Sequence, residues 1–150
     1  MKIRAFTDQD FADVERIYNL SKLDELKFEH HEFQLIPLTQ DRKRFAQLME
    51  SDIYLLESEG QVIAMAGLYQ NEVRAFFVHP DHRGNGYAGR LLQHMLAQTE
   101  GVVSLQVLAS NQPAKQLYLK SGFVVSEAIT GEYGGVPLTV ERMIRPDLSR

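Results

Sequence analysis

The twelve residues from His79 to Arg90 (HPDHRGNGYAGR) are the part of the chain whose types and spacing most clearly suggest chemistry. Glycines at positions 84, 86 and 89 lack the Cβ atoms that would keep a ligand away from the main chain, and they permit positive φ values. A helix that begins in this loop leaves its first N–H groups unpaired, at the end where the helix dipole favours negative charge. The loop could therefore bind a phosphate or pyrophosphate, with charge-assisted contacts from Arg83 and Arg90 at its two ends.

The segments on either side of the loop predict a strand and a helix. Residues 75–78 form a short aromatic and β-branched run that ends at Pro80, as expected for a buried strand. After the loop, apolar residues recur at intervals of three and four, which is typical of an amphipathic helix. These residues are Tyr87, Leu91, Leu92, Met95 and Leu96. The Asn85-Gly86 pair is also a hairpin signal, but that interpretation needs a second strand where the helical spacing lies.

Two common phosphate-binding motifs differ from this loop. A P-loop would need Lys-Ser or Lys-Thr after the last glycine, and the glycine spacing departs from the dinucleotide fingerprint. A dinucleotide-binding domain also places its loop after the first strand, whereas at least three strands are expected before this one.

Composition and charge narrow the class of protein. The chain has 150 residues, of which 44% are hydrophobic and 24% charged, as expected for one folded domain spanning 1–150. A formal net charge of −4 argues against a general binder of nucleic acid or of anionic membranes. A positively charged small molecule or peptide is the more natural partner.

The absence of cysteine excludes disulfides, thiolate metal sites and a cysteine nucleophile. No apolar run reaches the length of a membrane span, and the first eight residues lack the apolar core of a signal peptide. The expected location is the cytoplasm.

The whole pattern predicts a mixed sheet with helices on both faces. Strands are expected at 2–6, 53–57, 62–69, 72–78, 102–108, 123–128 and 138–144, and helices after Thr7, at 41–49, at 87–97 and from about 111 to 121. Residues 24–40 are predicted to be an irregular helix and loop, and residues 131–135 a glycine loop between the last two strands. The class is α/β or α+β, with about seven strands that are mostly antiparallel.

Three groups of residues resemble the GCN5-related N-acetyltransferase (GNAT) superfamily, in particular a small single-domain bacterial type. They are Phe77-Val78-His79-Pro80, the loop Arg83-Gly84-Asn85-Gly86-Tyr87-Ala88, and the later Asn111, Tyr118 and Gly122-Phe123. Arg83, Gly86 and Ala88 match the loop pattern of the family. The resemblance is sharpest from about residue 53 to 125 and only approximate before residue 50.

The resemblance implies acetyl-coenzyme A as the donor. Its pyrophosphate would lie on the amides of Arg83, Gly84, Asn85, Gly86, Tyr87 and Ala88. Its pantetheine would lie beside the strand that ends at Phe77-Val78, near Asn111. A backbone N–H near Val78 would then polarise the thioester carbonyl.

The same resemblance suggests two catalytic residues. Tyr118 matches the family tyrosine that protonates the leaving thiolate, although a tyrosine beside Leu117 and Leu119 could simply be a core residue. Glu72 stands where many relatives carry a glutamate that acts as the general base, directly or through water. It could instead face solvent, or form an ion pair with Arg74 on the same strand face.

Other polar clusters have weaker functional interpretations. His79 and His82 flank the loop and are expected at the surface. The His30-His31 pair, with Glu29 and Glu32, is a poor metal site because adjacent side chains rarely converge on one ion, so we expect no metal. The same segment could supply acceptor contacts.

The glycine loop at 131–135 could also border the acceptor site. There Tyr133 and Glu132 could meet an amine, although a plain glycine turn explains the loop as well.

The sequence thus predicts an N-acetyltransferase that transfers acetyl directly to a primary amine of a small molecule or peptide. Alternatives are an acyl-coenzyme A sensor without activity, or a protein that binds another nucleotide. A homodimer through the last strands is possible. No motif identifies the acceptor amine.

Overall fold

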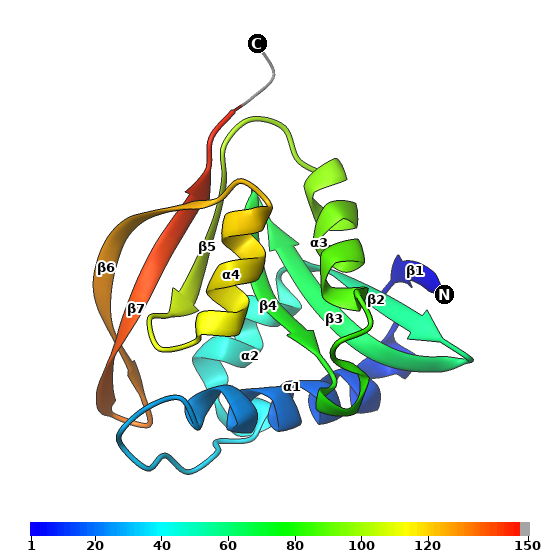
Figure 1. Ribbon diagram of the computed structural model, residues 1–150. Coiled ribbons are helices and arrows are strands. Elements are labelled where there is room, and N and C mark those ends of the chain that lie inside the picture. The colour runs from blue at the N-terminus through cyan, green and yellow to red at the C-terminus, as the bar shows by residue number, and fades with distance from the viewer. Residues whose placement is uncertain (148–150) are drawn as a thin grey trace.

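The computed structural model describes residues 1–147 and shows a twisted seven-stranded sheet between helices (Figure 1). The strands are β1 (Lys2–Ala5), β2 (Asp52–Ser58), β3 (Gln61–Tyr69), β4 (Glu72–Val78), β5 (Val103–Leu108), β6 (Val124–Tyr133) and β7 (Val136–Arg145). The helices are α1 (Phe11–Leu26), α2 (Arg42–Met49), α3 (Tyr87–Ala97) and α4 (Gln112–Lys120). The predicted fold class and order of elements are confirmed.

The sheet has one parallel contact, and that contact is short. In the described part of the chain the strand order is β1-β2-β3-β4-β5-β7-β6, and every neighbouring pair is antiparallel except β4 and β5. These two strands pair only at Glu72 with Ser104 and at Val73 with Leu105. Beyond Val73 they separate, so the middle of the sheet is open at one end.

A bulge in β4 lies beside this opening. Met65 of β3 pairs with Phe77 and Gly67 pairs with Arg74, so two residues of β4, Ala75 and Phe76, stand opposite a single residue of β3. Ala75 has a φ of 49°, which is rare for a residue with a side chain. Such bulges bend a strand and redirect its side chains, and they are frequent next to active sites.

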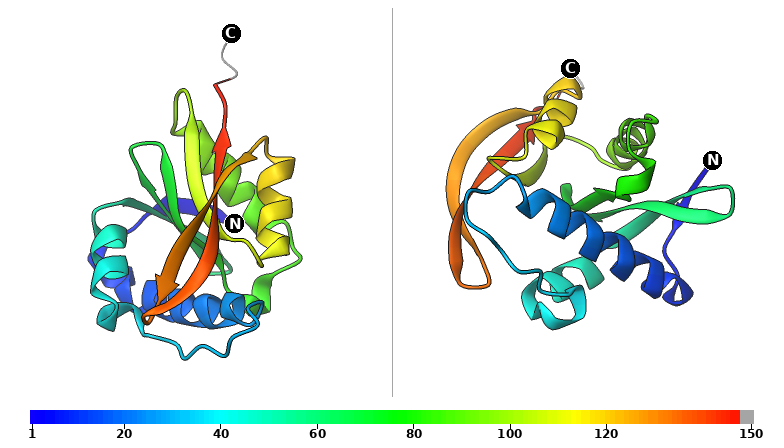
Figure 2. Two further views of the ribbon diagram at one scale, coloured as in Figure 1. Left: turned by 90° about the vertical axis from the view of Figure 1, so that its left-hand side faces the viewer. Right: turned by 60° about the horizontal axis from the view of Figure 1, so that its bottom comes forward.

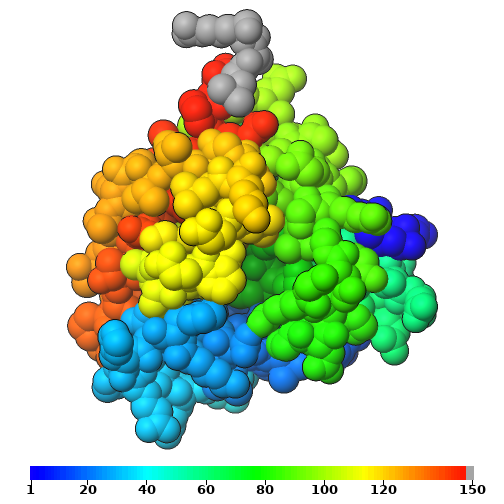
Figure 3. All heavy atoms as spheres, viewed as in Figure 1, coloured from blue at the N-terminus to red at the C-terminus, as the bar shows by residue number. Residues whose placement is uncertain are grey.

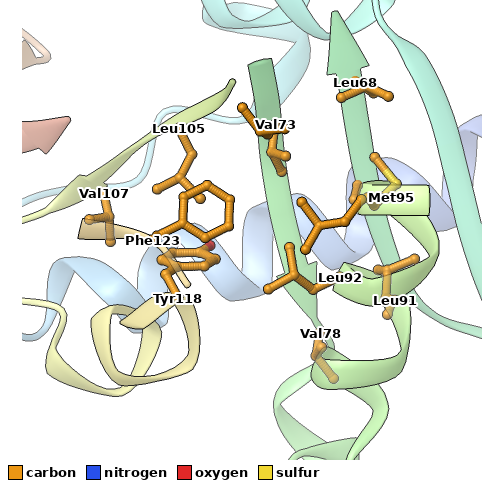
Figure 4. Packing of buried hydrophobic residues seen from close by; sticks show 14 of the residues in the cluster. Leu68, Val73, Val78, Leu91, Leu92, Met95, Leu105, Val107, Tyr118 and Phe123 are labelled. Atoms are coloured by element: carbon orange, nitrogen blue, oxygen red, sulfur yellow. The ribbon is translucent and has the colours of Figure 1, made fainter. Parts of the chain in front are cut away.

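The helices cover both faces of the sheet, as Figure 2 shows. On one face, α3 and α4 pack on alternate residues of β3 and β5. Figure 4 shows Leu92 and Met95 of α3 against the strands, and Tyr118 of α4 beside Phe123. On the other face, residues of α1 and α2 form a second cluster with Leu55 and Met65. Within residues 1–147, no helix combines the length and the apolar character that a membrane span needs.

The last hairpin differs from the prediction. Its strands continue through Gly131 to Tyr133, and the turn consists of Gly134 and Gly135 alone, with φ values of 58° and 80°. Positive φ at both central residues suits the right-handed twist of a two-residue hairpin. Gly131 serves close packing instead, because a Cβ there would lie 3.0 Å from a methyl group of Val140.

Apolar spacing in the sequence predicts a buried face of α1 made of Phe11, Val14, Ile17, Tyr18 and Leu20–Leu23, and the observed face is narrower. Leu20 and Leu23 are exposed, whereas Val14, Ile17, Tyr18 and Leu26 are buried. At the edge of the sheet, β6 is paired on one side by β7. The homodimer through these strands stays a prediction.

Gly67 should be needed for the bulge of β4. A Cβ at this position would lie 3.0 Å from Cβ of Ser51 and 3.3 Å from the carbonyl oxygen of Arg74. We expect Gly67→Ala to lower the free energy of unfolding by about 1–3 kcal/mol, as overpacking does. Urea denaturation of the purified protein measures this change.

Gly89→Ala is the matched control, because a Cβ at Gly89 in α3 meets nothing within 4 Å. It should stabilise the helix by about 0.5–1 kcal/mol. Equal effects of the two substitutions would show that crowding at Gly67 is unimportant.

Candidate active site

The gap between β4 and β5 opens into a cavity of about 290 Å³. Its walls come from the two strands and from α1, α2 and α4. In the space-filling view, the surface is hollowed between α4 and the loop before α3, with β4 at the bottom of the hollow (Figure 3). The separation of the strands therefore makes a binding site where a continuous sheet would have none.

The glycine loop forms one border of this hollow. Gly84 and Gly86 have φ values of 82° and 77°, and Gly86 is the residue that caps the N-terminus of α3. A Cβ on either glycine would meet nothing within 4 Å, so their backbone conformation, and not crowding, demands glycine. Residues 84–86 are exposed, so the turn that precedes α3 lies at the surface.

The two arginines of the loop are engaged by the protein itself. Arg83 forms an ion pair with Asp24 of α1, and its Nε donates to the carbonyl oxygen of Val78 at 3.3 Å. Arg90 lies against the sulfur of Met1. Ser21 also donates to the Val78 carbonyl, so α1, β4 and the loop are joined at one point. Any attraction of the loop for anions must then depend mainly on backbone amides.

The predicted contact residues on the strand and on α4 lie at the cavity or beside it. Phe77 lines the cavity and meets the Tyr18 ring edge-on at 5.5 Å. Asn111 also lines the cavity, and its Oδ1 accepts from the amide of Ala114 at 3.3 Å, which caps α4. The hydroxyl of Tyr87 lies 3.3 Å from that of Ser58, so its side chain is turned toward β2.

Tyr118 lies on α4, and its side chain lines the cavity. Only 5% of the residue is exposed, and its ring packs edge-on against Phe76 and Phe123. Burial raises the pKa of the Tyr118 hydroxyl above its ordinary value, and the negative charge of Glu25 adds to this effect. The phenol is therefore a neutral proton donor throughout the physiological pH range.

Glu72 also lines the cavity, at the start of β4. Its carboxylate accepts from Nε of Arg74 at 2.7 Å, and Arg74 is held in turn by Glu50 at 2.6 Å. The ion pair that the sequence left open as an alternative is thus present. Because Arg74 occupies a lone pair of Glu72, a base role for this carboxylate competes with the ion pair.

The opposite wall of the cavity carries cations that sequence reasoning missed. The Nζ atom of Lys22 lies 5.8 or 5.9 Å from the ring centroids of Tyr18, Phe77 and Tyr133, and it donates to Glu25 at 2.6 Å. Tyr18, Lys22 and Glu25 follow helical spacing on one face of α1. Polar residues at these positions of a buried face were the available signal.

Tyr133, a candidate contact for the acceptor amine, lines the cavity and is engaged by the protein itself. Its hydroxyl accepts from the amide of Ile36 at 2.7 Å and donates to the carbonyl of the same residue at 3.3 Å. Its ring faces Lys22 and the guanidinium of Arg44, which lies 5.0 Å from the centroid. Tyr133 therefore makes cation–π contacts with the chain's own cations. Glu132 is held by the amide of Gly135 at 2.7 Å.

Tyr18 contains the most unusual polar atom of the cavity wall. The residue is 3% exposed, and within residues 1–147 its hydroxyl is buried without a hydrogen-bond partner. Burial raises the pKa of this hydroxyl. A buried donor without a partner costs about 1–3 kcal/mol, which marks it as a candidate for contact with a ligand.

The histidines form no metal-like group. The rings of His79 and His82 meet edge-on at 5.5 Å, but no third ligand joins them in residues 1–147. His30 and His31 are exposed, and Nδ1 of His79 accepts from the amide of Asp81 at 3.1 Å. Burial lowers the pKa of His79. In the part of the chain that the structure describes, no three His, Asp or Glu side chains are grouped as metal ligands would be.

Comparison with known proteins identifies the family. Residues 14–123, which include the loop, the gap between the strands and Tyr118, match the model of the acetyltransferase (GNAT) family. The chain belongs to this family. Its membership makes the protein an acyltransferase that depends on acetyl-coenzyme A. Among curated proteins, no sequence matches this one.

Solved structures of GNAT acetyltransferases share the fold. A GCN5-related N-acetyltransferase from Rhodopseudomonas palustris is 18% identical, with a TM-score of 0.76 over 97% of this chain and 94% of that one. A putative acetyltransferase from Salmonella typhimurium, solved with its cofactor acetyl-CoA, is 21% identical, with a TM-score of 0.70 over 100% and 95%. A spermidine N-acetyltransferase from Vibrio cholerae, in complex with CoA and spermine, is 18% identical, with a TM-score of 0.71 over 97% and 95%.

Removal of one hydroxyl from this GNAT protein should stabilise it. Tyr18→Phe removes the buried hydroxyl that lacks a partner, and we expect the free energy of unfolding to rise by about 1 kcal/mol. Tyr133→Phe is the matched control, because it removes a hydroxyl with two hydrogen bonds to Ile36. It should cost about 1–2 kcal/mol. Urea denaturation measures both changes, and a loss of stability in Tyr18→Phe would show that its hydroxyl has a partner in solution.

Proposed function

We propose that this protein transfers acetyl from acetyl-coenzyme A directly to the primary amine of a small molecule or peptide. The observation that carries the proposal is the gap between β4 and β5, which places Tyr118 and the bulge of β4 around one cavity beside the glycine loop. Family membership supplies the donor and the type of reaction.

The donor would bind mainly to backbone groups. Its pyrophosphate would lie on the amides of the loop from Arg83 to Ala88, where Gly84, Asn85 and Gly86 form the turn and Tyr87 begins the helix. Its pantetheine would enter the gap beside Phe77 and Val78, near Asn111 of α4. Backbone N–H and C=O groups of β4 beyond the short pairing with β5 can bind the amides of such an extended ligand.

The chemistry needs two proton transfers and one polarised carbonyl. The lone pair of the neutral amine attacks the thioester carbon, the carbon–sulfur bond breaks, and the sulfur takes up a proton as coenzyme A leaves. The amine gives up one proton, so the products are an acetamide and free coenzyme A. An N–H of β4 near the bulge would stabilise the oxyanion in the intermediate.

Tyr118 is the proposed acid. Its phenol is neutral and buried, and it lies on the wall of the cavity that α4 forms. A buried thiolate has few solvent partners, so a proton from the phenol would be most useful as the carbon–sulfur bond breaks.

Glu72 is the proposed base, acting directly or through water. Its ion pair with Arg74 must loosen for the carboxylate to accept a proton. Glu25, which lies on the same cavity and contacts Lys22, is the other carboxylate within the cavity wall that could receive the proton.

Tyr118→Phe tests the acid role while it keeps the ring packing against Phe76 and Phe123. We expect kcat to fall about 100-fold, because a positioned general acid contributes that much or more. The Kd of acetyl-coenzyme A should hardly change. Steady-state kinetics and calorimetry measure the two quantities, with Tyr54→Phe on β2 as the control.

Equal turnover of Tyr118→Phe and the native protein would remove Tyr118 from the acid role. Firm binding of acetyl-coenzyme A without turnover on any amine of a broad panel would indicate a sensor in place of an enzyme.

A ligand test separates coenzyme A from other phosphates. Ligands that bind the folded state raise the melting temperature. At a ligand concentration of 100 times Kd, the folded state gains about 2.7 kcal/mol of stability. We expect acetyl-coenzyme A to shift the melting temperature in a thermal-shift assay and ATP and NAD at equal concentration to have little effect. A larger shift with ATP or NAD would favour a nucleotide-binding protein.

A further inference from the structure

The wall of the cavity opposite Tyr118 presents hydrogen-bond donors in excess. Lys22, Arg44 and Tyr18 all line the cavity, and the Tyr18 ring contacts Phe77 of β4. The positive charge of Arg44 acts on the Tyr18 hydroxyl, and the cation of Lys22 lies over the Tyr18 ring. Two cations and one phenol are thus gathered at one end of a small cavity.

These donors are only partly used by the protein. Lys22 has three N–H bonds and donates one to Glu25. Arg44 has five, of which Nη1 donates to Asp41 and Nη2 to the carbonyl of Glu132. The Tyr18 hydroxyl has no partner among residues 1–147. Unused donors on buried or half-buried groups call for an acceptor group on a ligand.

We propose that the amine substrate also carries a carboxylate, as a free amino acid does, and that Tyr18, Lys22 and Arg44 bind this carboxylate. The inference rests on the proposed acetyl transfer and names its substrate class. A carboxylate accepts up to about four hydrogen bonds, which matches a donor set of one hydroxyl and two cations. Its amine would then point from α1 toward the thioester, within reach of Glu25 or Glu72.

Charge and size argue against other amines. A polyamine would bring two or more positive charges into a cavity lined by Lys22, Arg44 and Arg74, and like charges oppose binding. The two carboxylates of the lining, Glu25 and Glu72, are already paired with Lys22 and Arg74. The cavity volume of about 290 Å³ lies at the low end for small-molecule sites and must also hold the acetyl end of the donor. A compact zwitterion satisfies both limits.

The carboxylate partners of Lys22 and Arg44 do not remove the preference of the cavity for a substrate with a carboxylate. Glu25 and Asp41 compensate the charges of Lys22 and Arg44, which lets the cations stay in a half-buried wall without a ligand. The Tyr18 hydroxyl has no such partner in the described residues, so it is the group that gains most from the carboxylate.

Matched amines test the proposal on the native protein. Each free amino acid of a panel is compared with its carboxamide and with the amine that lacks the carboxyl group, and coenzyme A release is followed. We expect kcat/KM to favour the best amino acid over its two analogues by about 100-fold or more, because the analogues leave donors of the site unpaired. The amide has the less basic and more fully deprotonated amine, so intrinsic reactivity would favour the opposite order.

Two variants locate the carboxylate. Tyr18→Phe and Lys22→Met should each raise the KM of the amino acid about 10-fold to 100-fold, the value of a hydrogen bond to a charged group. The KM of acetyl-coenzyme A should stay the same, and the preference for the acid over its amide should shrink. Lys43→Met, which removes an exposed lysine of α2, is the matched control and should leave all three quantities unchanged.

A binding measurement covers the case in which a variant does not fold. With coenzyme A present, calorimetry on the native protein should show tighter binding of an N-acetylated amino acid than of its N-acetylated amide.

The outcomes separate this inference from the proposed function. Acetylation of amides, polyamines or peptide N-termini as fast as of amino acids would overturn the carboxylate site and leave the acetyltransferase intact. Binding of acetyl-coenzyme A with no acetylation of any amine would overturn the proposed function, and the inference with it.

Discussion

The separation of β4 from β5 after two residue pairs is the constraint on which the rest of the structure depends. A parallel pair within a sheet would normally continue and satisfy its backbone groups along its length. Here the bulge at Ala75 and Phe76 turns β4 away, and Gly67 of β3 makes room for it. The cavity lies at this opening. Tyr118 of α4 lines it, and so do Tyr18 and Lys22 of α1. Had the strands stayed paired, these helices would have contributed only core residues.

Two residues of the cavity wall, Lys22 and Tyr18, lower the stability of the fold. Lys22 is half-buried among three aromatic rings with a single carboxylate partner, and the Tyr18 hydroxyl is buried with none in the described residues. An apolar side chain would fill either position at lower cost. By contrast, Tyr133, which borders the same cations, has both hydrogen bonds of its hydroxyl satisfied by Ile36. The two phenols lie beside the same lysine but differ in their bonding: Tyr133 joins the last hairpin to Ile36, whereas we propose a ligand as the partner of Tyr18.

Much of the fold could be predicted because its elements carry strong local signals. Alternating apolar residues indicated the strands, and apolar spacing of three and four indicated α3 and α4, which the structure caps with Gly86 and Asn111. The last hairpin was misplaced because Gly131 looks like a turn residue in sequence, and only the contact with Val140 shows that it serves packing. The bulge at Ala75 could not be predicted either, because alanine gives no sign of a positive φ. The space for the bulge comes from Gly67 on the neighbouring strand. Leu20 and Leu23 were assigned to the buried face of α1 because local periodicity does not reveal how much of a helix the sheet covers.

The two halves of the candidate site differ in how far sequence reveals them, and the reason is physical. In the proposed function the donor half acts through backbone amides, and the glycines that such a contact needs are visible in the sequence of the loop. Arg83 of the loop contacts Asp24 of α1 and the carbonyl oxygen of Val78 in β4, so the backbone amides remain the proposed anion ligands. In our proposal the acceptor half acts through side chains of α1 and α2, which line the cavity together with Tyr133 and which only the tertiary fold brings together. Each of these side chains alone is common in a helix or strand. Our proposal rests on their meeting at one cavity with N–H and O–H groups that the protein leaves unbonded.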